Sequence, residues 1–316
     1  MYRGTRRLRH LSTDIPKTAI IIAGPTAVGK TEIAYRVASE VDGEIISADA
    51  RQIYRGMIIG TAAPANSPIK HHLVGVLDPT ERCTAAWWAE KATSLINDIY
   101  SRRKIPLIVG GTGLYIRALV EGMFPDASKS PEIRKNLQNK AESGVDLHKE
   151  LSRVDPETAN RIHPNNIVRI IRALEIYYST GKPVSAHFEN TLSPAEDWAF
   201  LKFHLTRPRE ELYERINNRT RQMLDSGWVE EVEALLDSGI PRSAPGMEAI
   251  GYREICDFLE GKIEKANLSE IIARKTRNYA KRQMTWFRHR ESYEKIVLSS
   301  VSVEDCVRQI VTEYRK

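Results

Sequence analysis

Eight consecutive residues near the start of the chain, Gly24–Thr31, could grip a phosphate group. They read GPTAVGKT and match the pattern G-x-x-x-x-G-K-[ST]. Glycines let successive backbone N–H groups curl around an anion, and a helix N-terminus adds positive potential. Lys30 supplies a point charge, and the Thr31 hydroxyl could bind Mg²⁺. We predict an anion site, for ATP or for another diphosphate, formed by Gly24, Pro25, Thr26, Ala27, Val28, Gly29, Lys30 and Thr31.

A carboxylate follows the second apolar segment of the chain, at Asp49. Ligands of open α/β sheets bind at the ends of strands, so Asp49 could be a magnesium ligand, a general base or a helix cap. An ordinary ATPase of this kind holds Mg²⁺ with an aspartate that ends another strand. Here the apolar run Ile105–Val109 is followed by Gly110 and Gly111, and Asp78 is a substitute candidate. These residues weaken an ordinary NTPase interpretation without removing it.

A second candidate surface is basic. No acidic residue occurs between Ile271 and Arg290, where there are seven Lys or Arg. Helical spacing places a set of basic residues on one narrow face of this helix and a set of apolar residues on the opposite face. We predict that the basic face binds phosphate groups and that the apolar face packs against the core. The basic face consists of Arg274, Arg277, Lys281 and Arg288, and the opposite face of Ile272, Tyr279 and Trp286. A second helix, Asn165–Thr180, adds Arg169 and Arg172.

Bulk properties exclude several classes of protein. The 316 residues carry a charge of +6, from 47 basic and 41 acidic residues, which fits a polyanionic partner without requiring one. The three cysteines lie far apart and form no C-x-x-C pair, and the adjacent His71 and His72 have no third ligand nearby in sequence. A disulfide framework or zinc site is therefore not expected. No apolar run could span a bilayer, and we expect a cytoplasmic protein, without a membrane partner, that is a monomer.

Short apolar runs alternate with helical patterns in the first part of the chain. Strands are predicted at Thr18–Ala23, Glu44–Ala48, Ile105–Val109 and Phe200–Leu205, with His72–Leu77 as a further candidate. Such alternation is typical of a parallel sheet covered by helices on both faces. Further helices are predicted at Glu32–Glu40, Ala85–Arg103, Asn165–Thr180, Arg209–Ser226, Val229–Ser238, Glu248–Leu259 and Leu268–Arg290.

The pattern divides the chain into a core and an insertion. Residues 125–195 contain charged helical stretches and no strong strand, which predicts an all-helical insertion. Residues 17–124 and 196–316 would form an α/β core with a P-loop NTPase-like parallel sheet flanked by helices. Residues 1–16 carry Arg3, Arg6, Arg7 and Arg9 and read as a basic N-terminal tail.

An ordered set of segments resembles the tRNA dimethylallyltransferase family, in its bacterial form. The segments cover nearly everything from Pro16 to Arg290, and as a set they are far more specific than the phosphate loop alone. They are GPTAVGKT from residue 24, SADARQIYRGMIIGTAAP from 47, HHLVGVLDP from 71, IPLIVGGTGLYIRAL from 105, DPETANRIHPNNIVRIIRALEIYYSTGKP from 155, RPREELYERINNRTRQMLDSGWVEEV from 207, EAIGYREI from 248 and RKTRNYAKRQMTWFR from 274.

The resemblance implies a reaction and a set of roles. The family transfers a dimethylallyl group from dimethylallyl diphosphate to the exocyclic N6 amine of the adenosine next to the anticodon of tRNA, on its 3′ side. By resemblance, the catalytic residues would be Asp49 as the base, Thr26 at the bridging oxygen and Arg219 on the diphosphate, with Mg²⁺ as cofactor. Contacts to the anticodon stem-loop would come from Asp49, Ala50, Arg51, Gln52, Thr112, Val168, Arg169, Ile170, Ile171, Arg172, Glu248, Ala249, Ile250, Gly251, Tyr252 and Arg253, together with the basic face.

Several positions depart from the family's usual pattern. Ala50 stands where a serine is usual, Ile58 and Gly75 replace acidic residues, and Ala63 replaces a lysine. These departures concern the tRNA contacts near Asp49 rather than the reaction. The alternatives are a P-loop kinase of a nucleotide or small metabolite, a non-catalytic RNA-binding protein, and an enzyme that prenylates free AMP. ATP turnover without RNA would identify the kinase.

Overall fold

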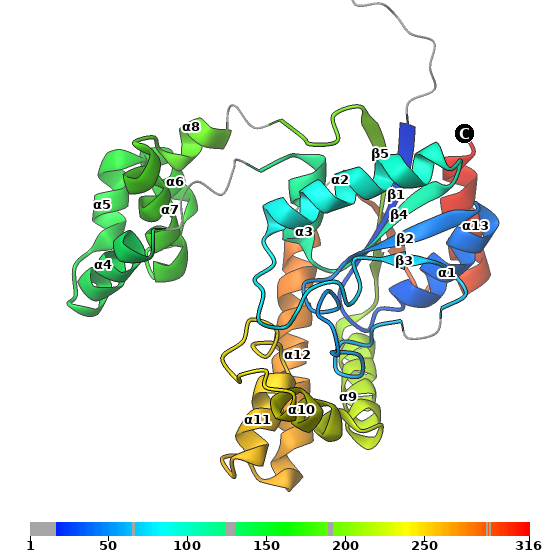
Figure 1. Cartoon of the computed structure of the whole chain (residues 1–316). Coiled ribbons are helices and arrows are strands. Elements are labelled where there is room, and N and C mark those ends of the chain that lie inside the picture. Colours follow the sequence, from blue (N-terminus) through cyan, green and yellow to red (C-terminus); the bar gives the residue numbers. More distant parts are fainter. Residues whose placement is uncertain (1–16, 65–66, 124–129, 189–191, 289, 291) are drawn as a thin grey trace, which may run out of the picture.

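The computed structural model describes residues 17–64, 67–123, 130–188, 192–288, 290 and 292–316. Its core is a six-stranded parallel sheet with strand order β3-β2-β4-β1-β5-β6, which confirms the predicted fold class (Figure 1). The predicted tail, residues 1–16, lies outside the described residues. The strands are β1 (Lys17–Ala23), β2 (Gly43–Ala48), β3 (His71–His72), β4 (Ile105–Gly110), β5 (Trp198–Thr206) and β6 (Glu294–Val297).

Alternate residues of the central strand β1 pack into two different apolar clusters, one on each face of the sheet. Ala19 and Ile21 pack into a cluster with helices α2 and α3, while Ile20 and Ile22 pack into another with α1, α9 and α13. Each face of the sheet is therefore buried under helices, as expected for parallel strands with apolar runs. These helices are α1 (Lys30–Glu40), α2 (Ala85–Ser101), α3 (Gly113–Val120), α9 (Arg209–Asp225), α10 (Trp228–Asp237), α11 (Tyr252–Leu259), α12 (Lys265–Arg288) and α13 (Val303–Tyr314).

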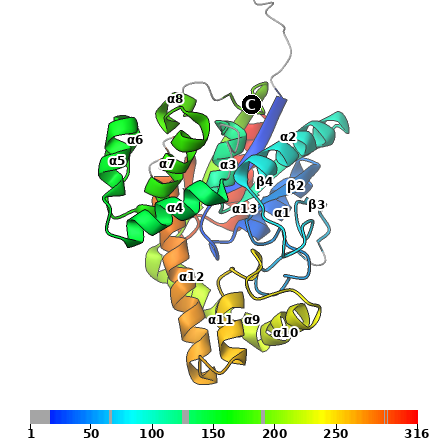
Figure 2. The same ribbon diagram turned by 60° about the vertical axis from the view of Figure 1, so that its left-hand side comes forward.

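The remaining helices gather apart from the sheet (Figures 1 and 2). They pack around their own apolar cluster, which includes Leu137, Leu151, Ile170 and Leu174. Such a separate core is what an all-helical insertion requires to hold its shape. The helices are α4 (Pro131–Glu142), α5 (Leu147–Val154), α6 (Pro156–Arg161), α7 (Ile167–Thr180) and α8 (Val184–Phe188). None of the described helices combines the length and the apolar character that a membrane crossing needs.

The structure differs from the sequence prediction at several elements, and helices α3 and α13 are among those not predicted. The candidate strand His72–Leu77 is only the two-residue β3, although Leu77 forms an isolated bridge with Tyr54. Helix α11 begins at Tyr252 rather than Glu248, because Gly251 stands at its N-cap with a φ of 95°. Strand β6 was not predicted, since EKIV is short and lies at the edge of the sheet, where only Ile296 is deeply buried.

A buried carboxylate ties the edge strand β3 to its neighbour. Glu44 on β2 is 4% exposed and accepts hydrogen bonds from both terminal nitrogens of Arg102, at 2.6 and 2.8 Å. His72 Nε2 lies 2.8 Å from the same carboxylate, whereas His71 Nδ1 contacts the carbonyl of Ile69. The two histidines thus serve different partners and do not form a metal pair. The Arg102 hydrogen bonds outweigh burial and hold the pKa of Glu44 at about 2.

We expect Glu44→Gln to destabilise the sheet-containing part at neutral pH by about 1.5–3 kcal/mol, because Arg102 loses its charged hydrogen bonds to Glu44 and keeps only the exposed Asp98. The calorimetric melting temperature should fall by roughly 2–5 °C. Because the pKa of Glu44 is lower in the folded protein than in the unfolded chain, the ionised carboxylate stabilises the fold fully above pH 4.5. This stabilisation is lost as the pH falls towards about 2, so the difference in stability between the parent and Glu44→Gln should be smaller at pH 3. The control is Asp42→Asn, at an exposed ion pair, which should change little. A deficit that is independent of pH would contradict this account.

Candidate active site

The loop after β1 forms one wall of a cavity. It runs from Gly24 to Gly29, and α1 begins directly after it at Lys30. Gly29 adopts a φ of 113°, a conformation that side chains with a Cβ rarely adopt, so the turn into the helix depends on glycine. The pattern at Gly24–Thr31 therefore has the strand–loop–helix setting that an anion-binding loop needs.

Lys30 lies across this loop. Its ammonium donates to the carbonyls of Gly24, at 3.0 Å, and Pro25, at 2.8 Å. Burial lowers the pKa of Lys30 to about 8; nearby Asp49 opposes this shift and Arg219 adds to it. A bound anion would stabilise the charged form of a lysine that is desolvated and lies beside a second cation.

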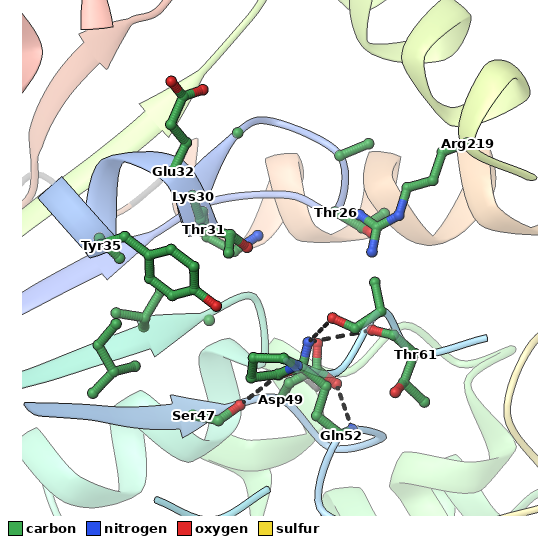
Figure 3. Close-up of a pocket in the computed structure, with 18 of the residues that line it drawn as sticks. Thr26, Lys30, Thr31, Glu32, Tyr35, Ser47, Asp49, Gln52, Thr61 and Arg219 are labelled. Carbon is green, nitrogen blue, oxygen red and sulfur yellow. Dashed lines mark hydrogen bonds between the residues drawn. The ribbon is translucent and has the colours of Figure 1, made fainter. Parts of the chain in front are cut away.

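Helix α9 supplies a polar wall opposite the loop. The cavity-lining residues recur at i, i+3, i+4 and i+7, which is one face of the helix, and they are Arg215, Asn218, Arg219 and Gln222. Arg215 Nε donates to the carbonyl of Ala27 at 2.8 Å, so it braces the loop. Burial lowers the pKa of Arg219, with Asp49 as an opposing influence. Figure 3 shows Arg219 extending from α9 into the cavity.

Asp49 stands on the far side of the cavity, at the end of β2. Its Oδ1 accepts hydrogen bonds from the backbone N–H of Arg51, at 2.8 Å, and of Gln52, at 3.4 Å. The Gln52 side chain in turn accepts from Ser47 and donates to the carbonyl of Thr61. Asp49 is thus a cap of the following turn and also faces the cavity, so the two roles are compatible (Figure 3).

Two cavities meet at this point. The first, of about 490 Å³, contains the loop, Lys30, Thr31 and the α9 wall. The second, of about 420 Å³, extends towards α10 and α12. The residues that line both are Thr26, Ala27, Asp49, Thr61 and Arg219. A reacting group held in one cavity would therefore meet a group held in the other between the loop and Asp49.

The second cavity has aromatic and basic walls. Tyr279 and Arg282 of α12 line it, and the Arg282 guanidinium lies 5.6 Å from the centre of the Tyr279 ring. Burial, with Asp49 nearby, raises the pKa of Tyr279 to about 12, so its hydroxyl stays protonated. Trp228 and the segment Glu248–Ile250 complete the wall. Aromatic faces and arginines of this kind suit a nucleobase.

Comparison with known families identifies this arrangement. A family model described as IPP transferase matches residues 52–290. The chain belongs to the IPP transferase family. A second model, described as isopentenyl transferase, matches residues 17–77, which contain the phosphate loop.

Individual members of the IPP transferase family are similar over most of the chain. The tRNA dimethylallyltransferase 1 of Pelobacter propionicus is 46% identical over 273 residues, covering 85% of this chain and 88% of the relative. The crystal structure of the tRNA isopentenylpyrophosphate transferase of Bacillus halodurans is 37% identical, with a TM-score of 0.70 over 95% of this chain and 96% of its own. A eukaryotic dimethylallyltransferase crystallised in action on tRNA is 26% identical, with a TM-score of 0.77 over 95% of this chain and 79% of its own.

The fold brings together many of the site residues predicted from the loop pattern and from the family resemblance. Thr26, Lys30, Thr31, Asp49 and Arg219 all line the first cavity. Many of the predicted tRNA-contacting positions line the second cavity, namely Asp49, Ala50, Arg51, Glu248, Ala249 and Ile250. Gln52 lines the first cavity instead, and Thr112 accepts a hydrogen bond from the backbone N–H of Ala50 at 3.0 Å.

Four predicted contact residues have partners within the protein, and three of them are buried. Ile170 and Ile171 are buried in the core of the insertion, because they lie on the apolar face of α7. Tyr252 is fully buried, and its hydroxyl donates to Glu231 at 2.6 Å. Arg277 donates to Asn217, at 2.6 Å, and to Glu270, at 2.7 Å. These side chains make contacts within the protein, and their assignment as tRNA contacts stays a prediction.

Other predicted positions are exposed. Arg172 lies at the edge of the insertion's core, where it donates to the buried Glu175 at 3.0 Å. Val168, Arg169, Arg253, Arg274, Lys281 and Arg288 are exposed. Within the described parts of the chain, Lys281 and Arg288 have no ion-pair partner. Their charges are thus available to a polyanion.

Sequence reasoning missed several residues of the site. Arg215 could have been found, because it lies four residues before Arg219 and thus on the same helical face. Tyr279 was assigned to the core face of α12, yet it lines the second cavity. Gln283 lines the first cavity although it belongs to a helix far away in sequence, and no local signal marks it.

Proposed function

We infer that this chain is a tRNA dimethylallyltransferase, which transfers a dimethylallyl group from dimethylallyl diphosphate to the N6 amine of the adenosine 3′-adjacent to the anticodon. The observation that carries this conclusion is the junction of the two cavities. A phosphate-binding loop with Lys30 forms one cavity, a wall with Tyr279 and Arg282 forms the other, and Asp49 stands between them. This arrangement suits the transfer of a group from a diphosphate to a base.

The donor diphosphate would lie in the first cavity. Lys30, Arg219 and the loop N–H groups would stabilise the charge that develops on the leaving diphosphate. The Thr31 hydroxyl and the Asp49 carboxylate line the same cavity, and such hard oxygen donors together with diphosphate oxygens suit Mg²⁺. A bound Mg²⁺ would further stabilise the diphosphate charge as a Lewis acid. Thr26, which lines both cavities, would lie at the bridging oxygen.

The acceptor adenine would lie in the second cavity. The base must leave its stack to reach Asp49, and Tyr279 and Arg282 offer surfaces on which an extruded base can rest. The exocyclic amine is a poor nucleophile because its lone pair is delocalised into the ring. Asp49 would accept the amine proton as the new N–C bond forms and the diphosphate departs.

The main alternative is a P-loop kinase, and few features of the structure support it. Its magnesium-binding aspartate would be expected at the end of β4, where Gly110 and Gly111 stand. The substitute Asp78 lies in a turn where its Oδ1 accepts hydrogen bonds from Thr80, and it lines neither of the two cavities. The exposed basic positions of α12 have no role in an enzyme whose substrates are a nucleotide and a small metabolite.

We propose that the tRNA is gripped at two places. Residues 17–124 and 196–316 form the catalytic core, and α12 offers Arg274, Lys281 and Arg288 to the RNA backbone. The helical insertion, residues 125–195, would contact the anticodon stem-loop through Val168 and Arg169 at the start of α7. Two grips are needed because holding one base out of its stack requires fixing the phosphates on each side.

The affinity for tRNA should fall steeply with salt, because phosphate contacts release counterions. Replacing both Lys281 and Arg288 with Gln should reduce the slope of log affinity against log salt by about two units, one for each lost contact. The matched control is Arg308→Gln on α13, an exposed position that the proposal places away from RNA. Equal slopes for the parent and the double variant would show that this face of α12 is only solvated surface.

The function itself is tested by incubating the protein with dimethylallyl diphosphate, Mg²⁺ and bulk tRNA. The tRNA is then digested to nucleosides, and the mass of the prenylated adenosine is sought. A parallel incubation with ATP and no RNA checks the kinase alternative. Free AMP in place of tRNA checks whether a small nucleotide suffices. Prenylation of AMP as efficient as that of tRNA, or ATP turnover without transfer, would overturn the proposal.

A further inference from the structure

The side chain of Gln283 bridges three separate parts of the site. Its Oε1 accepts a hydrogen bond from the backbone N–H of Thr26, at 2.9 Å, and its Nε2 donates to the carbonyl of Gly111, also at 2.9 Å. Gln283 belongs to α12 and is only 6% exposed, yet it lines the first cavity. One amide thus joins the basic helix, the phosphate loop and the end of β4.

The glycines after β4 make this bridge possible. A Cβ on Gly111 would lie 2.2 Å from Gln283 Nε2, and a Cβ on Gly113 would lie 2.0 Å from the Trp286 indole nitrogen. Gln283 and Trp286 are three residues apart and so share one face of α12. Glycines thus stand at the end of β4, where an ordinary P-loop enzyme has an acidic residue. Because they carry no side chain, α12 can pack closely against this part of the chain.

The bridge changes what the phosphate loop can offer. The N–H of Thr26 is committed to Gln283, so the N–H groups left for a diphosphate are those further along the loop. The backbone of Thr26 is held by a buried side chain that is hydrogen-bonded through both its amide oxygen and its amide nitrogen, at the point where the two cavities meet. A residue at the reacting junction is thus positioned by a helix whose other face is basic.

We propose that Gln283 is a positioning residue for the transfer, which fixes the backbone of Thr26 against the end of β4 and so holds Thr26 at the junction of donor and acceptor. The inference rests on the proposed function. Gln283 need not touch either substrate. Its loss would leave Lys30, Arg215 and Arg219 in place to bind the diphosphate, but Thr26 would no longer be held where the bond is broken.

The test is Gln283→Met, which conserves length and removes both hydrogen bonds. Single-turnover rate should fall about 10- to 100-fold, since displacement by about 1 Å can cost two orders of magnitude. The dissociation constants of dimethylallyl diphosphate and of tRNA, measured separately, should each change by less than about threefold, because the groups that bind them remain. Gln283→Asn, whose amide is too short to span both partners, should show the same split and guards against a folding failure of the first variant.

Two further variants distinguish positioning from packing. Met284→Leu, the next residue on α12, controls for altered helix packing and should keep the parental rate. Gly111→Ala should lower the rate at least as much, because its Cβ displaces the Gln283 amide and also lies 2.9 Å from the carbonyl oxygen of Gly24 in the phosphate loop. Parental rates in both Gln283 variants, or equal losses in rate and donor affinity, would overturn the assignment. A parent protein that transfers no prenyl group would instead overturn the proposed function.

Discussion

Asp49→Asn is expected to fold normally, bind tRNA within a few-fold of the parent and lose at least about a hundredfold in single-turnover rate. The change conserves shape, and an amide oxygen can still accept the hydrogen bonds from the N–H groups of Arg51 and Gln52. What it removes is the carboxylate that would take the amine proton. General bases contribute about 10²–10⁴ in rate, which corresponds to roughly 3–5 kcal/mol of barrier.

Magnesium concentration separates two explanations of that loss. Asp49 and Thr31 line the same cavity, so Asp49 could act chiefly by holding Mg²⁺. In that case, raising the magnesium concentration should restore much of the rate of Asp49→Asn, whereas a missing base would not respond. The assay is a single turnover at two magnesium concentrations. Near-parental activity at the lower one would show that Asp49 is only a cap of its turn.

Lys30→Ala should lower the single-turnover rate by about 10²–10³-fold and weaken donor binding by roughly 10–100-fold, because in our proposal the ammonium would face the leaving group. Affinity for tRNA should stay within a few-fold, since Lys30 lines the first cavity and not the second. Thr285→Ala, at an exposed position of α12, is a control for nonspecific effects on expression and handling. Equal losses of donor and tRNA affinity would contradict this separation of roles.

The pH dependence of donor binding should also reflect the charge of Lys30. Burial lowers the pKa of Lys30 to about 8 in the protein without a donor. A diphosphate binds the charged ammonium better than the neutral amine, so donor affinity should fall as pH rises above about 8. Below that pH the lysine is already charged and the dependence should level off. Calorimetric titrations between pH 7.5 and 9.5 should show this decline in the parent and lose it in Lys30→Ala.

Local sequence patterns predicted the loop and its setting closely. The apolar run before Gly24 and the helical pattern after Lys30 fixed the order strand, loop, helix, and β1 differs from the prediction by one residue. Asp49 was found from its place after an apolar run, and family resemblance supplied its role as the base together with Arg219; the fold places both around one cavity. Both kinds of signal lie in short contiguous segments, so they can be recognised from the sequence alone.

What the sequence could not show are the contacts between distant segments. Arg277 lies on the basic stripe by spacing, but only the packing of α9 against α12 reveals that Asn217 occupies its guanidinium. Gln283 and Thr26 are 257 residues apart, and nothing local links an amide in a basic helix to a phosphate loop. Ile170 and Ile171 show the same limit, because a matching motif does not say which of its residues face inward.

The separate core of α4–α8 has a consequence for cooperativity. All five tryptophans, Trp87, Trp88, Trp198, Trp228 and Trp286, lie outside the insertion, so their fluorescence follows only the sheet-containing part. Circular dichroism at far-ultraviolet wavelengths follows the helices of both parts. A unit of this size with its own small core is marginally stable alone. The two signals should therefore give different urea midpoints, and a single free energy of unfolding would not describe the whole chain.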